Sequence, residues 1–163
     1  MGHHITGLVL ATPWDEAVRA RFDLVAVPLR GVTMFHIDHY YSAYWRATLK
    51  WPGTLERPPG CSSLFPDDAV LAHIASELAG EATPTFGVIQ TDYFGGAGEQ
   101  WAALYTRTHR TSGDETSINA VLRMLGIVAA PGLDEFDTVG LGEHRRSPNQ
   151  LGRYVELCEA LGV

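Results

Sequence analysis

The segment His36-Ile37-Asp38-His39 holds the densest group of side chains that could do chemistry. Imidazole nitrogens and a carboxylate close together are typical ligands of zinc or iron. In an extended chain, His36 and Asp38 project to one face and His39 to the other. If a helix begins here instead, Asp38 becomes its N-cap and the histidines are structural. Both interpretations stand, because a metal site needs a further ligand that this segment does not supply.

A second group surrounds a turn that is rich in glycine. Residues 84–93 and 99–108 are both strand-like, and the glycines between them permit positive φ angles, so a β-hairpin is expected. Asp92 and Glu99 would then face each other across the hairpin. They could act as paired carboxylates, although like charges directly opposite each other cost stability.

The same hairpin carries three aromatic side chains, Tyr93, Phe94 and Trp101. Aromatic residues on a rigid turn are good anchors for a protein partner, although they can equally pack onto the core. The glycines do not form a phosphate-binding loop, because neither Lys-Ser/Thr nor a helix start follows them. A partner-binding hairpin that uses these aromatics with Asp92 and Glu99 is therefore the preferred hypothesis.

A third group is acidic and consists of Asp134, Glu135 and Asp137. Three carboxylates so close together could hold Ca²⁺ or Mg²⁺, but the spacing of an EF-hand loop is absent. The segment 134–141 is expected to be a solvated loop. A surface that meets a basic partner is the next interpretation.

Further catalytic signatures are missing from the chain. It contains no Gly-x-Ser-x-Gly elbow, and its two cysteines, Cys61 and Cys158, belong to neither a Cys-x-x-Cys pair nor a zinc pattern. Two buried thiols in a reducing compartment are expected. No cofactor is expected.

The net charge of −7 is distributed unevenly along the 163 residues. Residues 1–66 carry six Lys or Arg against five Asp or Glu, a net +1, whereas residues 67–163 carry six against fourteen, a net −8. An acidic half repels phosphate backbones, so nucleic acid is not an expected partner. It would attract a basic protein.

No apolar run approaches the roughly 20 residues that cross a bilayer, and no signal peptide is evident, so a cytoplasmic protein without membrane contact is expected.

Periodicity and turn residues predict the elements of one α+β domain over residues 1–163. Thr12 or Asp15 can cap the first helix, Pro66-Asp67-Asp68 is typical of a helix start, and Ser147 is expected to cap the last helix. Strands are expected at residues 5–11, 24–29, 32–38, 84–93 and 99–108. Helices are expected at about 14–22, 40–50, 66–79 and 116–125 and after Ser147, with Leu151, Tyr154, Val155, Cys158 and Leu161 facing inward.

This order contains too few β-α-β units for a doubly wound parallel sheet. A mixed, mainly antiparallel sheet covered by helices fits it better.

Several of these segments together resemble a class of small bacterial proteins. They are FDLVAVPL, MFHIDHYYSAYW, TDYFGGAGEQWA and INAVLRMLGI with DEFDTVGLGEHR. The chain is similar over most of its length to immunity proteins, which are encoded beside polymorphic toxins. The resemblance implies a cytoplasmic, acidic inhibitor that binds and blocks a cognate toxin domain. It carries no catalytic signature and no known binding residue.

Two functional hypotheses follow. In the first, the hairpin and the acidic segment cover a basic toxin domain. In the alternative, a metal-dependent enzyme uses His36, Asp38 and His39.

Overall fold

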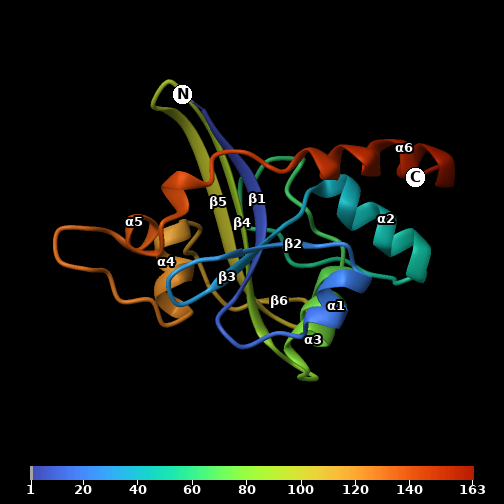
Figure 1. Ribbon diagram of the computed structural model, residues 1–163, viewed down its shortest axis with the longest axis horizontal. Helices are drawn as coiled ribbons and strands as arrows, with labels where there is room; N and C mark the ends of the chain where they lie inside the picture. The colour runs from blue at the N-terminus through green and yellow to red at the C-terminus, as the bar shows by residue number, and fades with distance from the viewer. Residues whose placement is uncertain (1) are drawn as a thin grey trace.

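The computed structural model describes residues 2–163 and is built on a six-stranded sheet (Figure 1). The strand order is β2-β3-β1-β4-β5-β6, and every neighbouring pair is antiparallel. The strands are β1 (His3–Leu10), β2 (Val25–Pro28), β3 (Thr33–His36), β4 (Thr85–Phe94), β5 (Ala97–Thr106) and β6 (His109–Arg110). The expected α+β class is confirmed, and the sheet is wholly antiparallel rather than mixed.

Helices cover both faces of the sheet. In Figure 1, α4 and α5 lie on one side, and α1, α2, α3 and α6 lie on the other. The helices are α1 (Glu16–Arg21), α2 (His39–Leu49), α3 (Val70–Ala79), α4 (Ile118–Met124), α5 (Glu135–Val139) and α6 (Arg153–Leu161), with 3₁₀ turns η1 (Leu141–Glu143) and η2 (Asn149–Gly152). Within residues 2–163, none of them has the length and apolar character needed to cross a membrane.

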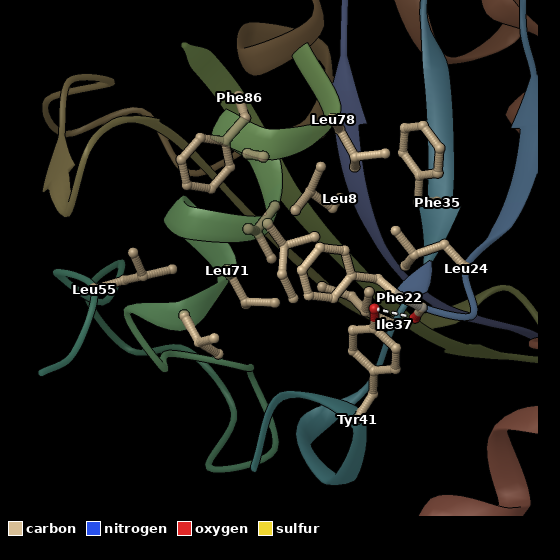
Figure 2. Close-up of a cluster of buried hydrophobic side chains, with 14 of the residues drawn as sticks. Leu8, Phe22, Leu24, Phe35, Ile37, Tyr41, Leu55, Leu71, Leu78 and Phe86 are labelled. Carbon is tan, nitrogen blue, oxygen red and sulfur yellow. Dashed lines mark hydrogen bonds between the residues drawn. The ribbon is translucent and has the colours of Figure 1, made fainter. Parts of the chain in front are cut away.

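The larger core lies between the sheet and α1, α2, α3 and α6. Figure 2 shows Leu8 of β1 and Phe35 of β3 among side chains from α2 and α3. The Tyr41 hydroxyl donates a hydrogen bond of 2.7 Å to the Phe22 carbonyl, drawn as the dashed line in Figure 2. This bond satisfies both polar groups, which would otherwise be costly in an apolar core.

The smaller core lies on the opposite face, under α4, α5 and η1. It takes the alternate side chains of the same strands, such as Ile5 and Val9 of β1 and Ile89 of β4. β1 is therefore buried on both faces over most of its length. This double burial explains why its sequence is an almost continuous apolar run.

Short-range capping chemistry predicts some helix starts correctly. The Asp15 side chain accepts hydrogen bonds from Ala17 N and Val18 N at the start of α1. Asp38 accepts one from Tyr41 N at the start of α2. Both carboxylates satisfy backbone donors that a helix leaves unpaired.

Other expectations about the helices are wrong. α3 begins at Val70 without a side-chain cap, because Asp68 instead accepts hydrogen bonds from Ser42 and Arg46 of α2. A 3₁₀ turn precedes α6, so Ser147 does not cap it. The expected inward face of α6 ends before Leu161, which is 49% exposed at the end of the helix.

Candidate functional site

The face of the sheet that carries the larger core changes character toward the tip of the β4–β5 hairpin. The registers of β1, β4 and β5 align side chains in rows across the three strands. Successive rows are Leu8, Val88 and Ala103; Thr6, Gln90 and Trp101; and His4, Asp92 and Glu99. The first row is buried beneath helices, the second is polar or amphipathic, and the third is charged. The sheet therefore carries polar side chains where its helical cover ends.

A cleft of about 470 Å³ opens over the second and third rows. Asp38, His39 and Tyr40, at the start of α2, line part of it. Leu64 and Val155 contribute apolar wall from the loop before α3 and from α6. Its size is typical of sites that hold a small molecule or a single large side chain.

Gln90 lies on the floor of this cleft and is 8% exposed. Its Nε2 donates to Thr6 Oγ1 at 3.2 Å and to the Leu64 carbonyl at 3.3 Å. Because the Leu64 carbonyl can only accept, Nε2 must face it, which leaves Oε1 as the free end of the amide. Oε1 is buried and receives no hydrogen bond from residues 2–163. An unpaired buried acceptor costs about 1–3 kcal/mol, so a donor from outside the chain would stabilise this oxygen.

Asp38 and His39 form the wall of the cleft at the start of α2. Asp38 Oδ1 accepts from Tyr41 N at 2.7 Å, and no side chain of residues 2–163 donates to this carboxylate. Burial raises the pKa of Asp38 above its usual value, against the opposing effect of the backbone hydrogen bonds from α2. The His39 ring contacts the Tyr40 ring in a tilted arrangement, with ring centroids 4.0 Å apart.

The charged row places two carboxylates directly opposite each other. Asp92 and Glu99 are cross-strand partners, as the hairpin prediction required. On its other side Asp92 pairs with His4, whose Nδ1 lies 2.9 Å from Asp92 Oδ1. His4 offsets part of the repulsion between the carboxylates when it is protonated, although solvent screens this exposed pair.

The hairpin exposes its predicted aromatic side chains to different degrees. Phe94, beside the turn, is 78% exposed. Tyr93 is half-buried, and its hydroxyl accepts a hydrogen bond of 3.0 Å from Gln100. Trp101 is half-buried in the wall of the cleft and donates to the Gly60 carbonyl at 3.2 Å. Phe94 is thus the free aromatic anchor, and Trp101 belongs to the cleft.

The residues expected for a metal site are not brought together. His36 is the cross-strand partner of Gly7 and is buried on the face of the smaller core, whereas Asp38 and His39 line the cleft. Burial, with a smaller contribution from His144, lowers the pKa of His36 to about 4. No group of three or more His, Cys, Asp or Glu side chains in residues 2–163 is placed to hold a metal ion. Asp38 is instead a helix cap.

The acidic segment is not a loop, which corrects the expectation for residues 134–141. It forms α5, and Asp134 caps that helix by accepting from Asp137 N at 2.8 Å. Glu135 binds Arg123 of α4 at 2.9 Å. Of the three carboxylates only Asp137 is both exposed and without such a contact among residues 2–163. α5 covers the face of the sheet opposite the cleft (Figure 1), so the acidic segment and the cleft do not form one surface.

Sequence reasoning missed Thr6, Gln90 and Leu64 as parts of a site. A signal for Gln90 exists, because it is polar and lies between Val88 and Asp92 on one face of a strand. Leu64 reaches the cleft from a loop that only the folded chain brings near β4.

Comparisons of the chain with protein-family models, with curated proteins and with solved structures found no match.

Proposed function

We propose that the chain is a protein-binding inhibitor of the immunity type, which blocks a basic toxin domain by covering its surface. The observation that carries the proposal is the end of the sheet, where the β4–β5 hairpin extends beyond both helix layers (Figure 1). It presents Phe94, 78% exposed, beside the opposed carboxylates of Asp92 and Glu99. An exposed aromatic side chain on a rigid turn can serve as an anchor for a protein partner.

The hairpin is preorganised for such a contact. Its strands pair without a break from Thr85 and Thr106 to Phe94 and Ala97. The turn itself consists of Gly95 and Gly96, whose φ angles of 61° and 81° suit glycine. A partner therefore meets a surface that loses little conformational entropy on binding.

The charge on this surface favours a basic partner. Asp92 and Glu99 lie at the tip, and the chain carries a net charge of −7. Such a field speeds encounter with a positively charged protein and slows it with acidic ones or with nucleic acid. Asp137, on the other face of the sheet, adds to the long-range field but lies outside the contact centred on Phe94.

The test uses the protein encoded next to this chain, as the resemblance to immunity proteins implies. We expect that protein to arrest growth when expressed alone, and the arrest to be relieved when this chain is co-expressed. The two purified proteins should form a stoichiometric complex. A neighbour that is not toxic, or whose toxicity this chain leaves unchanged, would contradict the proposal.

A matched pair of variants tests the surface. Phe94→Ser should weaken the complex by about tenfold or more, the usual effect of removing an aromatic anchor. Val128→Ser is the control, since Val128 is 85% exposed on the loop that follows α4, away from the hairpin tip. Equal affinity of the two variants would remove Phe94 from the interface.

A further inference from the structure

We infer that the cleft beside the hairpin binds a guanidinium group, the side chain of an arginine that the protein partner presents. This inference rests on the proposed function for the identity of the partner. The cleft itself is argued from the groups that line it.

The lining favours a cation. Asp38 and Asp92 supply carboxylates, and no lysine or arginine is among the lining residues. The start of α2 would attract an anion through its unpaired backbone donors, but Asp38 already occupies that position as the N-cap. The other titratable groups that line the cleft are His4, His39 and Tyr40. His4 already contacts Asp92, and the His39 ring contacts Tyr40.

The floor of the cleft favours a ligand that donates a hydrogen bond as well as one that carries positive charge. Gln90 is more than nine-tenths buried, and its Oε1 is unpartnered among residues 2–163. Thr6 and Leu64 hold the other end of the amide, which prevents the side chain from rotating to satisfy itself. A donor that enters the cleft would pair with Oε1. Because that oxygen is buried, we expect the lining side chains to shift when the donor enters.

A guanidinium group fits this lining better than an ammonium group. It is planar, and its several N–H donors point in different directions, which suits a cleft whose acceptors, Asp38, Gln90 and Asp92, come from more than one element. Tyr40 and Trp101 offer aromatic surface in the same cleft, and guanidinium stacks on such rings. Guanidinium is also the more weakly hydrated cation, so it loses less on entering a half-buried site.

The first experiment needs no partner protein. N-acetylarginine amide is titrated into the full chain, and the indole N–H signals of the tryptophans are followed by NMR. We expect the signal of Trp101 to shift in a saturable way and that of Trp51, which lies outside the cleft, to stay in place. N-acetyllysine amide should bind at least about tenfold more weakly. Equal affinity for the two amides, or no saturable shift of Trp101, would overturn the inference.

Two variants locate the binding groups. Asp38→Asn removes the charge but keeps an oxygen that can cap α2, so the fold should be preserved while affinity for the arginine amide falls by about tenfold. Asp137→Asn removes a carboxylate on the other face and is the matched control. Gln90→Met, which deletes the acceptor, should also weaken binding in folded protein. Unchanged affinity in Asp38→Asn would overturn the inference even if Gln90→Met did not fold.

The outcomes separate the two proposals. If the arginine amide binds but the neighbouring protein is not neutralised, the cleft is a guanidinium site and the proposed function fails. If the neighbour is neutralised but the amide does not bind, the inhibitor acts through the hairpin tip alone and the inference about the cleft fails.

Discussion

His3 and His4 are adjacent in β1, yet their environments are opposite. His3 is 8% exposed and uses both ring nitrogens, because Nε2 donates to the Leu141 carbonyl at 3.0 Å and Nδ1 lies 2.8 Å from Thr91 Oγ1. His4 is exposed and pairs with Asp92 at the rim of the cleft. The strand sends the two side chains to opposite faces. One face is covered at this level and the other is open, so the same residue type is structural in one place and available for contact in the other.

A second pair of histidines shows the same contrast. His36 is buried on the covered face, and burial lowers its pKa to about 4. His39, three positions later, contacts the Tyr40 ring in the wall of the cleft. Identity and proximity in sequence therefore say little about a histidine's role in this protein. The role of each histidine depends on whether other segments bury the face on which it lies.

The sharpest test of this contrast is to truncate each of the adjacent histidines. His3→Ala removes a buried ring together with its hydrogen bonds to the Leu141 carbonyl and the Thr91 hydroxyl, so we expect the free energy of unfolding to fall by about 3 kcal/mol. His4→Ala should cost less than about 0.5 kcal/mol, because its ion pair is exposed. Urea denaturation of both variants measures the difference. Equal losses of stability in the two variants would contradict the distinction between a structural His3 and an exposed His4.

The strand β4 offers the same test with a smaller effect. Thr91→Val removes the hydroxyl that contacts His3 and that accepts from Ile5 N at 3.1 Å. We expect a loss of about 2 kcal/mol in the free energy of unfolding. Asp92→Asn, on the open face, should change stability by no more than about 0.5 kcal/mol. If thermal and urea denaturation show a larger loss of stability in Asp92→Asn than in Thr91→Val, the covered face does not contribute more to stability than the open face.

The buried His36 predicts a pH dependence that appears only on acidification. Its pKa is about 4 in the folded protein and near 6.5 in an unfolded chain. Between these values the unfolded state binds the proton and the folded state does not, so stability falls as the pH is lowered from about 6.5 to about 4. His36→Leu should lose less stability than the wild type over that range. The urea midpoints of both proteins at pH 7 and pH 5 measure this loss. An equal loss in the wild type and in His36→Leu would contradict the assignment of the pH dependence to His36.

The smallest expected effect concerns the opposed carboxylates. Glu99→Gln removes the like charge across from Asp92 and should raise the free energy of unfolding by up to about 0.5 kcal/mol. Because the pair is exposed, the gain should vanish in high salt. Glu81→Gln, at an exposed position in the turn after α3, is the control. A loss of stability in Glu99→Gln would show that Glu99 makes a favourable contact instead.

Local chemistry predicted part of this molecule well. The glycine-rich segment indicates the hairpin, but its turn is Gly95 and Gly96 alone, shorter than the five residues left between the expected strands. This two-residue turn sets the register that pairs Asp92 with Glu99. Of the two interpretations of Asp38, the helix cap is confirmed, and it was within reach of the sequence because capping depends only on the residues that follow the cap. The helix expected to start at Pro66-Asp67-Asp68 begins only at Val70, because Asp68 binds Ser42 and Arg46, in a helix well before it in the sequence. The missed role of Gln90 has the same origin, since Leu64 reaches it from a separate loop.

The sequence by itself determined which residues alternate along β1, β4 and β5, because a strand turns successive side chains to opposite faces whatever surrounds it. Only the tertiary structure decided which of those faces would be buried. His3 finds its acceptor in Leu141, 138 residues further along the chain, while on the other side of the same strand the helices stop short and leave a cleft. Burial and pairing at this end of the sheet depend on segments far apart in sequence, and strand periodicity carries no information about where those segments pack.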